Sequence, residues 1–312
     1  MIEARDLTKI YGSTRAVNDL SFTVRSGVVT GFLGPNGSGK STTMRMVLGL
    51  DHPSKGTVTI NNKPYNQLHW PLREVGALLD AKALHPGRSA RNHLISIAQS
   101  NAIPLARVDE VLDLVGLTAV AKRKVGKFSL GMGQRLGIAG ALLGDPGVLL
   151  FDEPINGLDP EGILWVRTLL KQLASEGRTI FLSSHLMSEM ALTATDLVVI
   201  GQGSLIAETT VDDFVSSNTV ATVEVRSPAI DQLTEVLAAA GGSISAGDGG
   251  SILVTKLDAA AIGDASLAAG IALHELSPVK ASLEDVFMEL TAESTEYQAS
   301  GKGAGSAGTE TS

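Results

Sequence analysis

The feature that most constrains this chain is a glycine-rich stretch near its beginning that fits the pattern G-x-x-x-x-G-K-[ST]. An apolar run, Val28 to Leu33, precedes the stretch and predicts a short buried strand, whereas residues 42–50 after it predict a helix. Strand, glycine loop and helix in this order are the context of a phosphate-binding loop, whose backbone N–H groups point inward at one anion. The sequence therefore predicts a nucleoside triphosphate site that comprises Gly34, Pro35, Asn36, Gly37, Ser38, Gly39, Lys40, Ser41 and Thr42.

Two side chains at the end of this loop have separate expected roles. Lys40 would reach the β- and γ-phosphates, and the hydroxyl of Ser41 would coordinate Mg²⁺. The alternative is a glycine-rich turn that precedes a helix by chance and binds nothing. The strand before the loop and the helix after it favour the nucleotide site over that alternative.

The composition of the chain excludes several classes of protein. A length of 312 residues suggests one large domain or two smaller ones, and a net charge of −8 argues against a general nucleic-acid binder. The absence of cysteine excludes disulfides, thiolate metal sites and cysteine nucleophiles. The N-terminus lacks the apolar core of a signal peptide, and no apolar run approaches the roughly 20 residues of a membrane span. We therefore expect a cytoplasmic protein unless a partner holds it elsewhere.

A pair of acids follows a second predicted strand. Residues 148–151 are apolar and lead directly into Asp152 and Glu153, as in a buried parallel strand that ends at the ligand-binding edge of an α/β sheet. Asp152 could hold Mg²⁺, and Glu153 could polarise the attacking water. The alternative is a loop start or a helix cap, which the upstream phosphate loop makes less favourable.

A histidine follows the next predicted strand, Thr179 to Ser183. This strand end should lie beside that of Asp152, which would bring His185 near the γ-phosphate. A single histidine after a strand is usually structural, and that interpretation stays open on these residues alone.

Two further stretches allow either a structural or a functional interpretation. Tyr11 lies before a turn between two alternating strands, where it is an ordinary edge-strand aromatic or a surface that stacks on adenine. Ser129 and the glycines that follow it precede a helical run to Leu143, so Ser129 is either an ordinary helix cap or part of an anion-receptive helix N-terminus.

Residues 81–127 predict helices, and the basic run 122–124 is most simply a solvated face.

The order and spacing of these motifs resemble the ATP-binding subunit of an ATP-binding cassette (ABC) transporter over about residues 1–215. The motifs that carry the resemblance are Tyr11, Gly34 to Ser41, Ser129 to Gln134, Phe151-Asp152-Glu153-Pro154, Gly157-Leu158-Asp159-Pro160 and His185. The resemblance implies an α/β fold of the P-loop NTPase class, with a mixed sheet core, an antiparallel β subdomain and a helical insertion at about residues 81–145. It also implies an ATPase that uses ATP and Mg²⁺.

The resemblance gives the residues of the nucleotide site more specific roles. It implies that Tyr11 stacks on adenine and that Asp152 completes the metal site begun by Ser41. The catalytic residues would be Lys40, Glu153 as the general base, and His185 as a contact to the γ-phosphate.

The resemblance also implies a homodimer and a membrane partner. Ser129, Gly131 and Gln134 would belong to a signature loop that acts on ATP bound by the opposite subunit, and Asp159 to a loop at the dimer contact. Two copies would face each other head to tail. The membrane helices would belong to a separate permease subunit, which would dock on the insertion near residues 80–91 and hold this subunit at the cytoplasmic face of the membrane.

Two departures from the family pattern indicate a subgroup. Residues 73–79 predict a strand that ends at Asp80. Asp80 stands where the family usually has glutamine and would be a charged ligand near Mg²⁺, while Leu130 and Met132 replace glycine and glutamine of the common signature loop. This variant, with residues 76–80, is similar to export ATPases of the daunorubicin and bacitracin type. We therefore expect a subunit that powers export of a drug, antibiotic or other small or lipophilic molecule. A nutrient-import ATPase and a nucleotide-switched regulatory protein are the alternatives.

The C-terminal part predicts a separate small domain at residues 216–290. Its pattern is strand 219–225, helix 229–240, strands 242–245 and 251–255, helix 258–269 and strand 271–276, which is the βαββαβ order of a ferredoxin-like fold. An amphipathic helix at 282–290 follows and resembles the C-terminal element of the export subgroup. The composition of residues 291–312 predicts disorder.

Overall fold

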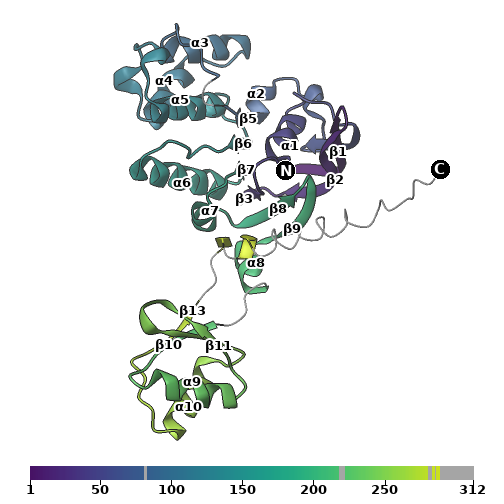
Figure 1. The fold of residues 1–312 in the computed structure, drawn as a ribbon. Helices are drawn as coiled ribbons and strands as arrows, with labels where there is room; N and C mark the ends of the chain where they lie inside the picture. The colour runs from purple at the N-terminus through teal and green to yellow at the C-terminus, as the bar shows by residue number, and fades with distance from the viewer. Residues whose placement is uncertain (81–82, 218–221, 280–282, 285, 289–312) are drawn as a thin grey trace, which may run out of the picture. The chain divides into compact units, whose positions relative to one another are not determined.

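The computed structural model describes residues 1–80, 83–217, 222–279, 283–284 and 286–288. The chain divides into two compact units, Met1–Val211 and Asp212–Ser312 (Figure 1). The described residues also include the helix α8 (Val211–Ser217) and the short 3-10 helices Tyr65–Gln67, Thr118–Val120, Val125–Lys127 and Asp248–Gly250.

A three-stranded antiparallel sheet forms one layer of the first unit. Its order is β2-β1-β4, with β1 at Ile2–Tyr11, β2 at Thr14–Val24 and β4 at Lys55–Ile60. Burial alternates along much of β2, because successive side chains point to opposite faces of a strand. Gly12, with φ of +58°, forms the tight turn between β1 and β2.

A six-stranded mixed sheet forms the centre of the first unit. Its order is β5-β6-β7-β3-β8-β9, and all neighbouring strands pair in parallel except β8 with β9. Every residue of β3 and β7 is buried, which explains why their sequences are mainly apolar and contain no charged residue. The bounds of the strands are β3 (Val29–Leu33), β5 (Val75–Leu78), β6 (Val148–Asp152), β7 (Thr179–Ser183), β8 (Asp196–Gly201) and β9 (Ser204–Thr210).

The strand predicted at residues 73–79 is shorter in the structure. Arg73 and Glu74 belong to a short helix, α2 (Pro71–Glu74), and β5 begins only at Val75. Pro71 is at the first helical position, where its fixed φ favours a helical turn and its missing N–H costs nothing.

The helices of the first unit form two groups. α1 (Lys40–Val47), α6 (Pro160–Ser175) and α7 (Met187–Thr193) each follow a strand of the mixed sheet. Figure 1 shows α3 (Ala90–Ser100), α4 (Ala106–Leu114) and α5 (Leu130–Leu142) grouped together beside β5. This second group is the helical insertion that the sequence predicts.

Three phenylalanine rings join the two sheets of the first unit. Phe22 of β2 stacks on Phe32 of β3 and on Phe181 of β7, with ring centroids 5.7 and 5.5 Å apart. Phe32 and Phe181 are 4.9 Å apart, and all three rings are buried. This packing, worth about 0.5–1.5 kcal/mol per ring pair beyond area burial, fixes β3, and with it the start of the glycine loop.

Within its described residues, the second unit contains a four-stranded antiparallel sheet that shares its core with the helices α9 and α10. The strand order is β11-β12-β10-β13, and the buried side chains of the sheet and helices include Val225, Leu237, Val254 and Ile262. Its elements are β10 (Thr222–Arg226), α9 (Ile230–Ala239), β11 (Ser243–Ala246), β12 (Ile252–Thr255), α10 (Ala259–Ala268) and β13 (Glu275–Val279). The described elements therefore follow the βαββαβ order.

The last strand of this unit lies later in the chain than residues 271–276, where the sequence predicts it. Ile271 is buried in the core, but extended pairing begins only at Glu275, opposite Arg226. The apolar pattern identified a buried segment but not the residues that pair. Residues 219–221 of the predicted first strand, parts of the helix predicted at 282–290, and residues 291–312 lie outside the described residues.

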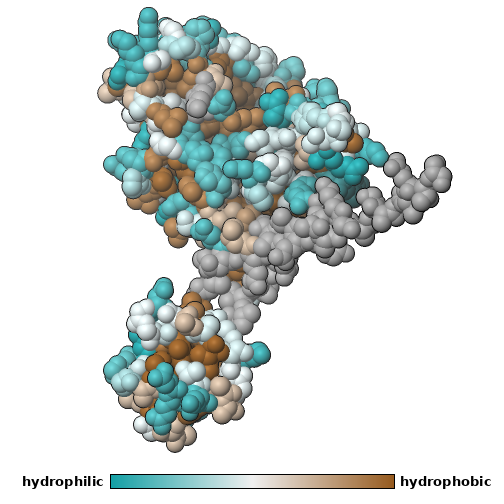
Figure 2. Space-filling model, viewed as in Figure 1, coloured by the Kyte–Doolittle hydropathy of each residue, from teal (hydrophilic) through white to brown (hydrophobic). Residues whose placement is uncertain are grey.

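Hydrophilic side chains cover most of the face shown in Figure 2, with apolar ones gathered in smaller patches. In the part of the chain that the structure describes, no helix has both the length and the apolar character needed to cross a membrane.

Candidate functional site

The loop between β3 and α1 has a backbone that only glycine allows at several positions. Gly37 and Gly39 have φ of +82° and +103°, in the region that side chains disfavour. A Cβ on Gly39 would lie 2.5 Å from the oxygen of Ala16, and one on Gly34 would lie 2.6 Å from the oxygen of Ile200. The loop therefore fits tightly between neighbouring backbones and leads directly into the N-terminus of α1, where a helix favours an anion.

Lys40 lies at the base of this loop. Its Nζ donates hydrogen bonds to the main-chain oxygens of Gly34 at 2.7 Å and Pro35 at 3.1 Å. Burial lowers the pKa of Lys40, and the nearby carboxylates of Glu153 and Asp152 partly offset that effect. The ammonium is therefore held within the loop, directed to where a phosphate would be cradled.

Asp152 joins the end of β6 to the loop. Its Oδ2 accepts a hydrogen bond from Ser41 Oγ at 2.7 Å, and its Oδ1 accepts one from Ser183 Oγ. A carboxylate and a hydroxyl at this separation are the hard oxygen ligands that Mg²⁺ prefers, few enough to leave positions for water and phosphate. The donor set thus fits Mg²⁺. Ser183 was not among the predicted residues, although the sequence places it at the end of a strand beside Asp152.

Glu153 has a constrained backbone. Its φ is +52°, which is uncommon for a residue other than glycine. Its N–H donates to Oγ of Ser183 at 3.1 Å, and its main-chain oxygen accepts from Gln134 Nε2 at 3.0 Å. Its Oε2 lies 2.8 Å from Nδ1 of His185. The carboxylate therefore has a defined orientation beside Asp152.

Most of the predicted nucleotide residues line one cavity of about 320 Å³. Eight residues that the sequence predicts for the site line this cavity, namely Asn36, Gly37, Gly39, Lys40, Ser41, Thr42, Asp152 and Glu153. Ala16 and Leu79 complete its lining. Asp80 is exposed and is not part of this lining, whereas its neighbour Leu79 is. The cavity brings a phosphate-binding loop and two carboxylates together.

Tyr11 lies outside that lining and is 46% exposed. Its hydroxyl donates to Oδ2 of Asp51 at 2.9 Å, and Arg45 donates to the same oxygen at 2.7 Å. These hydrogen bonds, first that of Arg45 and then that of Tyr11, lower the pKa of Asp51. Nζ of Lys9 lies 4.8 Å from the centroid of the Tyr11 ring. Asp51, which the sequence analysis did not identify, therefore orients the tyrosine.

The predicted signature-loop residues have different environments. Ser129 is exposed, and its Oγ caps α5 by accepting a hydrogen bond from the N–H of Met132 at 3.2 Å. Gly131 is half-buried, whereas Gln134 is only 4% exposed. The expectation that Gln134 acts on the opposite subunit does not fit this placement, because its amide is buried and bonds to Glu153 of its own chain.

The predicted dimer-contact residue also caps a helix. Asp159 accepts a hydrogen bond from the N–H of Gly162 at 2.9 Å and so fixes the start of α6.

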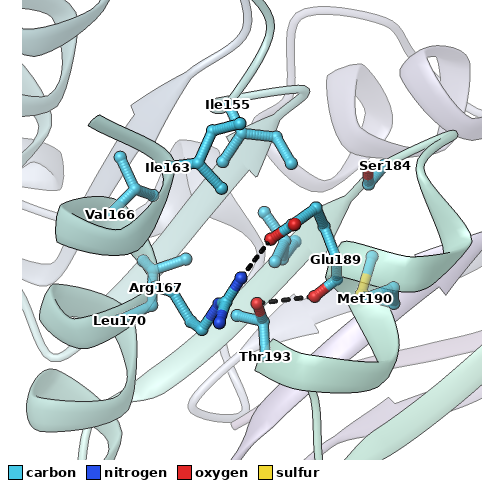
Figure 3. A pocket seen from close by; sticks show the side chains of 10 residues that line it. Ile155, Ile163, Val166, Arg167, Leu170, Ser184, Glu189, Met190 and Thr193 are labelled. Carbon is cyan, nitrogen blue, oxygen red and sulfur yellow. Dashed lines mark hydrogen bonds and ion pairs between the residues drawn. The ribbon is translucent and has the colours of Figure 1, made fainter. Parts of the chain in front are cut away.

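Figure 3 shows how α6 packs against α7, the helix after His185: Arg167 points at Glu189, and the two form an ion pair of 2.6 Å. The space that these residues surround is about 10 Å³, room for no more than one water. It is therefore a packing gap and not a second ligand site.

Comparison with known proteins places this geometry in a family. A family model described as "ABC transporter" matches residues 17–156, and a model described as a domain of unknown function matches residues 221–284. An uncharacterised ABC transporter ATP-binding protein of Bacillus subtilis is 37% identical over 300 residues, which cover 95% of this chain and 97% of the relative. A bacitracin transport ATP-binding protein of Bacillus licheniformis is 43% identical over 226 residues, or 70% of this chain and 72% of the relative.

A solved structure agrees with these matches. It is a dimeric ATP-binding cassette in a post-hydrolysis state bound to ADP and Pi, with a TM-score of 0.62 and 25% sequence identity. The match covers 68% of this chain and 99% of that one. The expected P-loop NTPase fold is confirmed, and the chain belongs to the ABC transporter family, as an ATP-binding subunit with ATPase activity.

Proposed function

We propose that this ATPase powers the export of a drug, antibiotic or other small or lipophilic molecule through a separate membrane permease. The support for export is the 43% identity to a bacitracin transport protein, together with the variant signature loop that contains Leu130 and Met132. Binding to a permease would hold the subunit at the cytoplasmic face of the membrane. A nutrient importer shares the same motifs and is the alternative of the same class.

The observation that carries the catalytic part of this proposal is the position of Glu153 in the cavity wall. Its carboxylate lies in the same lining as Lys40 and Ser41 and is held by Nδ1 of His185. A carboxylate there can orient a water and accept its proton as the water attacks the γ-phosphorus, while the lysine ammonium stabilises the charge on the leaving phosphates. Ser41 and Asp152 would hold Mg²⁺, which when bound neutralises charge on the phosphate oxygens.

The proposal places Ser129 and Gly131 at the ATP of a second copy, with Asp159 at the same contact. The exposure of Ser129 at the start of α5 supports this, because an exposed helix N-terminus favours a negatively charged group. Two ATP molecules between two head-to-tail copies would stabilise the closed dimer, and loss of the γ-phosphate would release it. This cycle would be transmitted to the permease.

Transport in inside-out membrane vesicles tests the direction and the coupling. The subunit and its permease are co-expressed, and ATP with Mg²⁺ is added outside, where the ATPase faces. An exporter accumulates labelled bacitracin or another amphipathic cargo inside, and Glu153→Gln abolishes the accumulation. ATP-dependent release of cargo preloaded with a binding protein would instead show import. ATPase activity that does not respond to the permease would favour a regulatory protein.

A further inference from the structure

Gln134 connects the helix that carries the signature loop to the proposed general base of the same chain. It lies in the second turn of α5 with 4% of its surface exposed. Its Nε2 donates a hydrogen bond to the main-chain oxygen of Glu153 at 3.0 Å, and the N–H of Asn156 donates to the same oxygen at 3.2 Å. A buried amide with this partner is engaged within its own subunit.

The backbone that Gln134 holds is a strained one. Glu153 has φ of +52°, and a residue with a side chain keeps such a conformation only where its surroundings fix it. Ser183 fixes the N–H side of Glu153, because both its oxygens accept from that N–H, at 3.1 and 3.2 Å. Gln134 fixes the carbonyl side. The direction of the Glu153 carboxylate therefore depends on two neighbours, one in the strand β7 and one in α5.

A second set of contacts joins the same two segments. The side chain of Leu130, at the start of α5, packs so closely on Gly157 that a Cβ at Gly157 would overlap it. A Cβ on Gly131 would lie 3.3 Å from Cδ2 of Leu158. The loop of residues 153–159 therefore contacts the first two turns of α5 near both of the loop's ends.

We propose that Gln134 is a positioning residue for hydrolysis in its own subunit: its amide holds the left-handed backbone of Glu153 that presents the carboxylate to the nucleotide cavity. This inference rests on the proposed role of Glu153 as general base. In the proposed dimer, the first turn of α5 faces a second subunit, while Gln134 in its second turn holds the backbone of Glu153 in its own subunit. A displacement of α5 therefore changes the position of the Glu153 carboxylate.

The substitution Gln134→Met tests the inference in the full chain assembled with its permease. Methionine has nearly the same length and remains buried, but it donates no hydrogen bond to Glu153. We expect kcat for ATP hydrolysis to fall about 10- to 100-fold while KM for ATP stays unchanged, because the hydrogen bond orients the base and does not contact nucleotide. The matched control is Gln172→Met, at an exposed position of α6, which should change neither constant. An unchanged kcat in Gln134→Met, or a rise in KM alone, overturns the inference.

A dimerisation assay separates this role from a contact to the opposite nucleotide. In the Glu153→Gln background, ATP-dependent dimer formation should be the same with and without Gln134→Met. Loss of the dimer would place Gln134 in the opposite site and overturn the inference. If Gln134→Met does not fold, Gln134→Leu replaces it, since leucine also suits a buried position and cannot donate to the carbonyl, and the same outcomes apply. A normal hydrolysis rate in Glu153→Gln alone would instead refute the general base itself, whatever Gln134→Met does.

Discussion

Lys40 is the residue whose charge the nucleotide site depends on most directly. Its Nζ is held by the oxygens of Gly34 and Pro35 in a buried position, where it would face the phosphates. Lys40→Ala should raise the Kd for ATP about 10- to 100-fold, because it removes a charge-assisted hydrogen bond. Isothermal calorimetry with a non-hydrolysable ATP analogue measures this, and an unchanged Kd would contradict it.

The pH dependence of nucleotide binding follows from the same residue. Burial lowers the pKa of Lys40, so the free protein loses this charge at a lower pH than an ordinary lysine does. Bound phosphates favour the charged form, so affinity should fall as the pH rises above the pKa of the free protein. The affinity of Lys40→Ala should show no such fall over the same range, and calorimetry at increasing pH compares the two proteins.

Glu153 should affect the rate of hydrolysis and not the binding of ATP. Glu153→Gln keeps the shape of the side chain and an oxygen beside Nδ1 of His185, but it removes the base. We expect kcat to fall roughly 10²- to 10⁴-fold, or about 3–5 kcal/mol in the barrier, with Kd for ATP retained. Steady-state ATPase kinetics and calorimetry separate the two effects, and a normal rate would reject the assignment.

At the residue scale, the sequence allowed us to predict the residues that lie next to a motif but not their distant partners. Lys40, Ser41, Asp152 and Glu153 follow strand ends, and parallel strands bring such ends to one edge of a sheet. The cavity lining and the register of Asp152 with Ser183 agree with that expectation. The hydrogen bonds between distant residues depend on how separate elements pack, and a local sequence pattern carries no information on that packing. These are the bonds of Asp152 to Ser183, of Tyr11 to Asp51 and of Glu153 to Gln134.

At the scale of elements, α5 and β5 pack so closely that a glycine is required between them. A Cβ on Gly76 of β5 would overlap the oxygen of Ala141 and lie 2.8 Å from Leu149 Cδ2. Gly76→Ala should therefore destabilise the first unit by about 1–3 kcal/mol, because the helix must shift away from the strand. Thermal unfolding measures the effect. The control Gly147→Ala, whose Cβ would contact no atom within 4 Å, should unfold near the wild-type temperature.

The elements themselves were largely predictable, and the differences have local causes. The continuous apolar runs of β3, β6 and β7 identified buried strands because both faces of the sheet are covered. The prediction for β5 began too early because the turn at Pro71 favours a helical start over extension. The prediction for β13 began too early because a buried apolar residue, Ile271, precedes the paired residues. Apolar patterns report burial, whereas pairing is set by the neighbouring strand.

At the scale of the whole molecule, the proposed function requires the first unit to contribute two different surfaces to a site that it shares with a second copy. The cavity holds the phosphate loop and the carboxylates, while Ser129 at the start of α5 is exposed. α6 is tied to α7 by the ion pair of Arg167 with Glu189, and its start is fixed by the cap that Asp159 provides. The exposure of Ser129 supports the proposal that the start of α5 contributes to the nucleotide site of a second copy.

A substitution at Ser129 tests whether that second copy binds through the N-terminus of α5. Ser129→Asp should keep the cap of the helix, because an aspartate also accepts a hydrogen bond from the N–H of Met132. Its added negative charge would face the triphosphate of the opposite subunit, so it should abolish ATP-dependent dimerisation while each copy still binds ATP. Analytical ultracentrifugation of the full chain in the Glu153→Gln background, with saturating ATP and Mg²⁺, measures the dimer.

The matched control is Ser89→Asp, the same exchange at the cap of α3, where Ser89 accepts from the N–H of Asn92 at 3.2 Å. That protein should dimerise like its parent, because its new charge lies on another helix of the insertion. If Ser129→Asp and Ser89→Asp both leave the dimer intact, the contact to the second nucleotide does not involve the start of α5. If the parent itself stays monomeric with ATP and with its permease, the shared site is wrong, because each copy would then have to hydrolyse ATP with its own residues alone.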